Sequence, residues 1–183
     1  HNAKDLYNQS IMDGLRETKI LGLTKNIGVS IYDPQDAIYA AKLKEIDYIQ
    51  IPYNAFDKRL DQCGFFELSK ENHKTIFARS AFLQGLLVMN IEQLPSKLSD
   101  ARTFLKEFGE ISARHGFSKL EAAFLYSYCH AGIDYVTFGV DTVEQLECNL
   151  RIANRASYFK DCFGELYDAL RNVPERIIIP SLW

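Results

Sequence analysis

The chain has 183 residues, of which 47% are apolar and 25% are charged, and its formal net charge is −3. This composition is typical of a globular protein with one sizeable core, so we expect a single unit over residues 1–183. The basic residues are scattered, which argues against a nucleic-acid partner. No apolar run is long enough to span a bilayer, and the amino terminus lacks a basic-then-apolar signal pattern. We therefore expect a cytoplasmic protein without a membrane partner.

Helical periodicity and end signals predict a series of helices along the chain. They cover residues 6–21, 34–43, 57–71, 97–114, 118–131 and 142–157. Gly22 is placed to end the first helix, and Asp33 with Pro34 forms an N-cap and first turn for the second. Ser118 with Glu121, and Thr142 with Gln145, have the spacing of a capping box. The tail RIIIPSLW is apolar enough that we expect it to pack against the protein.

Four β-rich runs each end in a small or polar residue and open into a helix. They are KNIGVSIYD (25–33), DYIQIPYN (47–54), TIFARSAFLQG (75–85) and YVTFGVDTVEQ (135–145). Short strands separated by helices pair in parallel through right-handed crossovers, and strands that are apolar on both faces are buried on both faces. The pattern predicts an α/β fold, half of a (β/α)8 TIM barrel, with candidate site residues at the carboxyl ends of its strands.

Single strand-end residues are weak signals. Ser30 fits a turn hydroxyl as well as a ligand contact, and Gly85 fits a corner as well as a close approach to a ligand. Gln50 is more informative, because an amide within a buried parallel strand needs a polar partner. The four cysteines have no metal spacing and are expected to be reduced, buried thiols. His73, His115 and His130 share no metal spacing either, so we expect solvated or packed side chains and no metal.

Taken together, four segments resemble the carboxyl-terminal half of the aldo-keto reductase family, in a bacterial form. They are GVSIY (28–32), IQIPYN (49–54), RSAFLQGLL (79–87) and GVDTVEQLECNL (139–150), in family order, with IIIPSLW similar to the family's terminal segment. The resemblance implies barrel strands 5–8 of an NAD(P)H-dependent oxidoreductase that reduces an aldehyde or ketone. Of the catalytic aspartate, tyrosine, lysine and histidine, only the histidine would fall here, at His1. The isolated chain is then expected to be inactive.

The same resemblance assigns cofactor-binding positions. Ser30 and Gln50 match side chains that bind the nicotinamide carboxamide, and Arg79 replaces an aromatic residue that stacks on the nicotinamide. Ser80, Leu83 and Gly85 match positions near the pyrophosphate, and Gln145 and Asn149 match positions at the adenosine end. Gly139, Asp141 and Thr142 precede the last helix, where Asp141 replaces residues that bind a 2′-phosphate.

A carboxylate at position 141 repels a 2′-phosphate and accepts hydrogen bonds from a ribose diol, so NADH is expected to be used at least as well as NADPH. The other interpretation of Asp141 is a carboxylate that caps the helix. A non-catalytic half-barrel that binds nucleotide or self-associates is the alternative function, because half a barrel leaves open strand edges. A missing amino-terminal half or a second copy is the expected partner. A flavodoxin-like open sheet would need glycine-rich phosphate loops, and the motif order argues against it.

Overall fold

The computed structural model describes residues 3–183, which group into two compact units. The first contains the residues up to Pro52, Arg59–Arg79 and Ala131–Tyr135, and the second contains Tyr53–Lys58, Ser80–His130 and Val136–Trp183. Whether they unfold together as the single unit expected for residues 1–183 stays a prediction.

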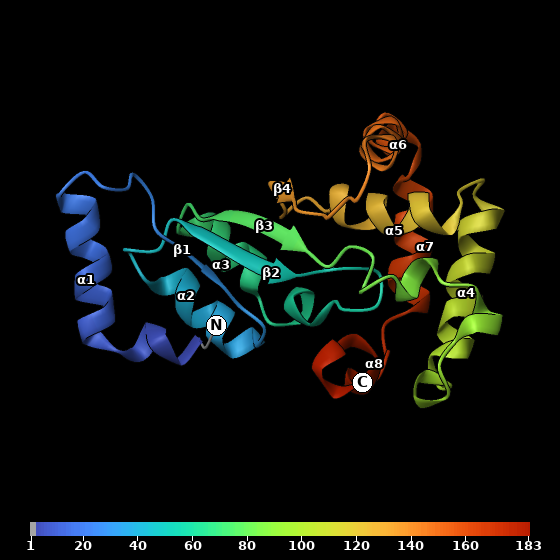
Figure 1. Cartoon of the computed structure of the whole chain (residues 1–183), viewed down its shortest axis with the longest axis horizontal. Helices are drawn as coiled ribbons and strands as arrows, with labels where there is room; N and C mark the ends of the chain where they lie inside the picture. Colours follow the sequence, from blue (N-terminus) through green and yellow to red (C-terminus); the bar gives the residue numbers. More distant parts are fainter. Residues whose placement is uncertain (1–2) are drawn as a thin grey trace. The chain divides into compact units, whose positions relative to one another are not determined.

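The first unit is built on a parallel sheet whose strands follow chain order, β1-β2-β3-β4 (Figure 1). The strands are β1 (Gly28–Ser30), β2 (Tyr48–Pro52), β3 (Thr75–Arg79) and β4 (Tyr135–Val136). The register pairs Val29 with Ile49 and Ile49 with Ile76. Four parallel strands in sequential order are confirmed.

The regular strands are shorter than the sequence predicts. The segment expected to be extended over 134–140 pairs only at Tyr135–Val136. Among the described residues β3 is its only neighbour in the sheet. The first strand is also short, with three residues and one neighbour.

The two faces of this sheet differ in burial. Side chains on one face, including Ile49, Ile51 and Ile76, are buried. Helix α2 (Pro34–Lys42) contacts β2 and packs on α3 (Phe65–Glu71). Along β2 the residues of the other face are exposed or half-buried. The expectation of strands buried on both faces is therefore wrong for this face.

Local end signals explain where the helices of the first unit begin and end. Asp33 caps α2 by accepting from the Gln35 N–H, as predicted. The single helix expected over 6–21 is wrong: a 3₁₀ turn (Ala3–Tyr7) precedes α1 (Gln9–Ile20), because the Asn8 side chain caps α1 at Ser10 N–H. The helix expected over 57–71 is also divided, into a 3₁₀ turn (Arg59–Gln62) and α3, with Gly64 between them at φ +72°.

The second unit is mainly helical. Its helices are α4 (Ala101–Arg114), α5 (Lys119–Tyr128), α6 (Val143–Ala153), α7 (Lys160–Ala169) and α8 (Glu175–Ile178). Short 3₁₀ turns cover Leu86–Val88, Ile91–Gln93, Ser96–Leu98, Ala156–Tyr158 and Pro180–Leu182. The capping box of Ser118 and Glu121 is confirmed. In the tail, Ile177 and Ile178 are buried, so its packing is confirmed too.

The sequence analysis missed α7. This helix lies against α4, and the Phe163 ring stacks on Tyr126 of α5 at 4.6 Å between centroids (Figure 1). At its carboxyl end, the buried Lys58 ammonium donates to the carbonyls of Leu166 and Tyr167 at 3.4 and 2.8 Å. A cation at the negative end of a helix macrodipole stabilises that end.

All four cysteines are free thiols, as expected, but only Cys162 is buried; Cys63 is exposed and the other two are half-buried. Burial, followed by the charge of Glu165, raises the pKa of the Cys162 thiol to about 12. Over residues 3–183, no helix has the length and apolar character needed to cross a bilayer.

Two aspartates fix the alignment at the amino ends of the strands. Asp47 donates its backbone N–H to the Ile27 carbonyl at 2.8 Å and accepts the Ile27 N–H on its carboxylate at 2.8 Å. Asp134 makes the same pair of bonds with Ile76, at 3.0 and 2.7 Å. Both aspartates lie in an Ile-Asp-Tyr triplet at the start of alternate strands. Each aspartate thus makes hydrogen bonds to the neighbouring strand segment at the amino end of a strand pair.

Replacing Asp47 by asparagine tests this role. Burial alone would raise the pKa of Asp47, but hydrogen bonds from Lys19 and the Ile27 N–H outweigh it and hold the pKa below its ordinary value. We expect Asp47→Asn to lower the free energy of unfolding by about 1–2 kcal/mol near neutral pH, measured by urea denaturation. Because the folded pKa is depressed, the contribution is present above the unfolded pKa of about 4 and is lost as the pH falls.

The gap between the wild type and Asp47→Asn should therefore close as the pH drops from about 5 towards 3. Asp13→Asn is the control, because the exposed Asp13–Arg16 ion pair should contribute less than about 0.5 kcal/mol. Equal losses in both variants would contradict a special role for Asp47.

Candidate functional site

The carboxyl ends of β1 and β2 place the two polar candidates in one row across the sheet. The register pairs Ser30 with Gln50, and Gln50 with Phe77. The Ser30 hydroxyl donates to the Gln50 carbonyl oxygen at 3.1 Å, which shows that both side chains are on the less buried face. The bond leaves the amide nitrogen of Gln50 as a donor and the hydroxyl oxygen of Ser30 as an acceptor.

Two residues further along the strands, the register places the positively charged side chain of Arg79. Pro52 pairs with Arg79, and the Arg79 guanidinium extends back to β1, where it donates to the Ile31 carbonyl at 3.2 Å. Its carbon lies 4.1 Å from the centroid of the Tyr32 ring. The Arg79 side chain thus bridges β3 and the end of β1. The resemblance placed Arg79 at a position where the family has an aromatic residue; in this structure its guanidinium stacks on Tyr32.

Tyr32 was not identified from the sequence. It lies two residues beyond Ser30, and its side chain is 58% exposed. A second guanidinium, that of Arg59, donates to the Tyr32 carbonyl at 3.5 Å. Tyr32 could have been predicted from strand alternation, because residues 28, 30 and 32 lie on one face of an extended backbone.

Aromatic rings cover the amino-terminal part of the same face. Phe77 stacks on Tyr135 at 4.8 Å and meets Tyr48 edge-on at 5.7 Å between centroids. These cross-strand contacts hold the face beside Gln50 in place. The candidate site in the first unit is therefore the Ser30–Gln50 pair, with the aromatic rings on one side and the Arg79 guanidinium on the other.

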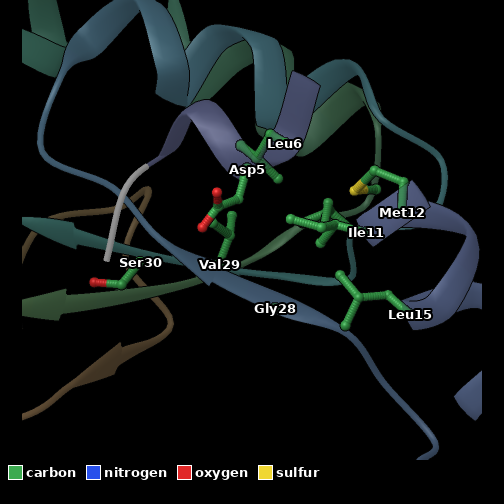
Figure 2. Close-up of a pocket in the computed structure, with 9 residues that line it drawn as sticks. Asp5, Leu6, Ile11, Met12, Leu15, Gly28, Val29 and Ser30 are labelled. Carbon is green, nitrogen blue, oxygen red and sulfur yellow. The ribbon is translucent and has the colours of Figure 1, made fainter. Parts of the chain in front are cut away.

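An open groove of about 240 Å³ runs beside the edge strand β1. It is lined mainly by apolar side chains of α1 and β1, among them Ile11, Met12 and Leu15. Figure 2 shows Val29 pointing from β1 towards Asp5, with Ser30 at the end of the groove. Residues 28 and 30 alternate with Val29, so their backbone groups face the open edge of the sheet.

In the second unit, the segment Ser80–Gly85 has an unusual backbone. Ser80, Leu83, Gln84 and Gly85 all have positive φ, at 65°, 46°, 54° and 85°. Non-glycine residues pay about 1–2 kcal/mol each for this conformation, which is concentrated at functional sites in many proteins. The N–H groups of Leu83 and Gly85 donate to the carbonyls of Ser80 and Phe82. Both N–H groups are therefore hydrogen-bonded within the loop.

The hydrogen bonds at the amino end of α6 decide whether Asp141 caps this helix. Thr142 is the N-cap, and its hydroxyl accepts the Gln145 N–H at 3.3 Å. The Gln145 side chain returns to accept the Asp141 N–H at 2.8 Å. The helix cap is therefore Thr142, and the exposed Asp141 side chain is available for another role.

Two further candidates in this segment differ in exposure. Gly139 is exposed, whereas Asn149 on α6 is only 5% exposed. The helix ends at Ala153, earlier than the predicted residue 157, and a separate 3₁₀ turn follows.

Two of the described histidines contact other side chains of the chain. His1 lies outside the described residues. His115 pairs with Glu165 at 2.7 Å, and His130 packs on the Tyr53 ring at 4.7 Å between centroids. In the part of the chain that the structure describes, no three histidine, cysteine or acidic side chains are placed to hold a metal ion.

A family model described as the aldo/keto reductase family matches residues 2–169, and the chain belongs to this family. No curated protein matches it significantly. The fold is similar to aldo-keto reductase AKR11C1 from Bacillus halodurans in its holo and apo forms, with TM-scores of 0.64 and 0.65 and 21% identity. Both matches cover 83% of this chain, and 55% and 56% of the solved chains.

A second similar structure is the glycerol dehydrogenase AKR11B4 from Gluconobacter oxydans. Its TM-score is 0.66 at 16% identity, and the match covers 88% of this chain and 55% of that one. The chain thus spans about half the length of these solved relatives. At these identities the similarity concerns the fold, and the function has to be argued from the site.

Proposed function

We propose that this chain is the carboxyl-terminal half, barrel strands 5–8, of an NAD(P)H-dependent aldo/keto reductase that reduces a small aldehyde or ketone to an alcohol. Membership of the family supports the reaction class. The sequential parallel sheet and the match to about half of each longer relative support the assignment to half a barrel. A cytoplasmic location remains part of the proposal.

The observation that carries this proposal is the hydrogen-bonded pair of Ser30 and Gln50 at the strand ends. A primary carboxamide needs one acceptor for its N–H and one donor for its carbonyl, and the pair keeps both available. The chemistry of these side chains therefore fits a nicotinamide carboxamide. When bound, the cofactor supplies the hydride.

The resemblance, taken residue by residue, assigns further cofactor contacts to the second unit. Ser80, Leu83 and Gly85 match positions that approach the pyrophosphate. The start of α6 would lie at the adenosine end through Gly139, Asp141, Thr142, Gln145 and Asn149. The positive end of the α6 dipole favours a phosphate there.

The isolated chain is proposed to be inactive, because hydride addition places negative charge on the carbonyl oxygen, which needs a positioned acid. The resemblance places the acidic tyrosine and its lysine and aspartate neighbours before this segment. Of the catalytic set it assigns only His1, which would orient the carbonyl.

The first test is turnover and binding by the 183-residue chain. We expect no aldehyde reduction above background with NADH or NADPH, and NADH binding that Gln50→Ala weakens about tenfold, since a lost hydrogen-bond partner costs roughly 1–2 kcal/mol. Absorbance at 340 nm measures turnover and NADH fluorescence measures binding.

Glu67→Gln, an exchange on the surface of α3, is the control and should bind NADH like the wild type. Steady turnover that survives His1→Ala but disappears in Gln50→Ala would show that the chemistry has been assigned to the wrong residues.

Asp141 supports use of NADH. Because Thr142 caps α6, the Asp141 carboxylate is exposed near a helix end that would otherwise attract a 2′-phosphate. Repulsion between like charges at a partly exposed site amounts to roughly 1–2 kcal/mol.

In the complete enzyme, NADH should therefore be used at least as well as NADPH. Asp141→Ser and Asp141→Lys should shift the ratio of kcat/KM towards NADPH by about five- to thirtyfold, the larger shift being expected for lysine. Glu144→Gln, which removes a carboxylate in the first turn of α6, is the matched control. Strong NADPH selectivity that does not change in Asp141→Lys would contradict the assignment.

A second candidate function is a non-catalytic module that associates with itself, and one observation favours it. Helix α6 carries an apolar stripe of Val143, Leu146 and Leu150, at the spacing that places side chains on one helix face. Val143 is 67% and Leu150 is 59% exposed. Apolar stripes of this kind pack against a partner helix in many assemblies.

If this module self-associates, light scattering should report a dimer or larger species at micromolar concentration. Leu150→Glu should shift the protein towards monomer, because removal of apolar surface from water contributes roughly 25 cal/mol per Å². Arg151→Glu, on the neighbouring position of α6, should have a smaller effect. A wild-type monomer at every concentration would contradict this second function.

A further inference from the structure

Strand β1 lies at an edge of the sheet. Among residues 3–183, β2 is the only strand that pairs with it. Ile31 donates its N–H to the Gln50 carbonyl at 2.8 Å, on the side of β2. Because the backbone groups of successive residues face opposite sides of a strand, those of Gly28 and Ser30 face away from β2. The edge therefore offers backbone donors and acceptors to one further strand.

The buried face of the sheet continues into the groove beside β1. In one row across the strands, Ile76 is 2% and Ile49 is 0% exposed, whereas Val29 in the same row is only half-buried. Next to Val29 lies the groove of about 240 Å³, with α1 on its other side (Figure 2). Ile11 of α1, which lines the groove, is 40% exposed. The row of core side chains thus ends at an open space in front of α1.

Contacts near both ends of α1 hold this helix across the groove. Just before its amino end, the Tyr7 ring stacks on Tyr39 of α2 at 4.3 Å between centroids, and the Tyr7 hydroxyl donates to Asp36 at 3.1 Å. Near its carboxyl end, the Lys19 ammonium binds the Asp47 carboxylate at 2.7 Å. The groove is therefore formed before a partner enters it, which lowers the cost of binding.

The order of the elements indicates what fits there. Helix α2 connects β1 to β2, α3 connects β2 to β3, and both pairs of strands are parallel. Helix α1 precedes β1 in the same way, so a strand that it connects to β1 comes before α1 in sequence. Asp5 and Leu6, in the turn that leads into α1, line the groove together with Ser30 at the carboxyl end of β1. A parallel strand in the groove ends beside this turn.

We propose that the edge of β1 and the groove beside it bind a parallel β-strand, formed by the segment that directly precedes this chain in the complete protein. Its backbone pairs with Gly28 and Ser30, and its alternate apolar side chains fill the space between Val29 and Ile11. The inference rests on the part of the proposed function that makes this chain half of a barrel. It does not depend on the cofactor.

Amide hydrogen exchange, followed by NMR, tests the backbone pairing. The probe is a synthetic peptide of the about ten residues that precede position 1 in the encoded protein, enough for one strand. We expect the peptide to slow exchange of the Ser30 N–H about tenfold or more. The Ile31 N–H, which already donates to Gln50, is the internal reference and should change much less. A peptide of the same composition in scrambled order should protect neither.

A charge on α1 tests the groove. Ile11→Glu places a carboxylate among apolar side chains and should weaken peptide binding about tenfold, measured by fluorescence anisotropy of the labelled peptide. Ile20→Glu is the matched control. Ile20 is 78% exposed and lies on the opposite side of α1, about two and a half turns further along the helix. The control should bind the peptide like the wild type.

Two variants of Ser30 separate the backbone from the side chain. Ser30→Pro removes the N–H that faces the edge and should weaken peptide binding about tenfold, whereas Ser30→Ala keeps this N–H and should bind like the wild type. Both variants lose the hydroxyl that donates to Gln50, so a difference between them does not come from that bond. Urea denaturation checks that both variants are folded.

Several results would overturn the inference. They are an encoded protein without a preceding segment, no protection of the Ser30 N–H by the peptide, and equal binding of the scrambled peptide. Protection that rises with protein concentration in the absence of peptide would make a second copy the occupant and would overturn it as well. If NADH binds and Gln50→Ala weakens it, the cofactor proposal stands in each case. If the peptide binds as expected and NADH does not, the cofactor proposal is wrong and the strand site stands.

Discussion

The alignment of β1, β2 and β3 is the constraint on which the rest of the site depends. Side chains alternate along a strand, so a shift by one residue would turn Ser30 and Gln50 to the buried face and bring Val29 and Ile49 out. The bonds between Asp47 and Ile27 prevent such a shift, because the backbone and the carboxylate of one residue hold both polar groups of its neighbour. The hydrogen bonds at the amino ends of the strands thus determine which side chains lie on the exposed face at their carboxyl ends.

Local signals in the sequence were sufficient for much of this fold. The caps at Asp33 and Ser118 depend on residues within three positions, and both form as predicted. Helix α7 was missed because its stability comes from distant partners. It contains Gly164, which disfavours a helix, while Lys58 binds its last carbonyls and Tyr126 stacks on Phe163. Contacts separated by about 40–110 residues leave no local pattern.

The candidate site divides in the same way. The proximity of Ser30 and Gln50 follows from strand alternation and from the parallel order, and it could be predicted. The stack of Arg79 on Tyr32 could not, because it depends on the register that pairs Arg79 of β3 with Pro52 of β2 and on the conformation of a long side chain that extends to the end of β1. The alternative interpretation of Asp141 as the cap of α6 is wrong, because Thr142, the next residue, has the capping spacing to Gln145 and accepts its N–H.

Asp141 places a charge where the family resemblance suggested a residue that binds a 2′-phosphate. Within the proposed function, its carboxylate would act on the 2′-phosphate, the group that distinguishes NADPH from NADH. The Thr142 hydroxyl already accepts the Gln145 N–H, so a substitution at Asp141 leaves the cap of α6 in place. A change in cofactor preference in an Asp141 variant could therefore be attributed to the charge at this position and not to loss of the helix cap.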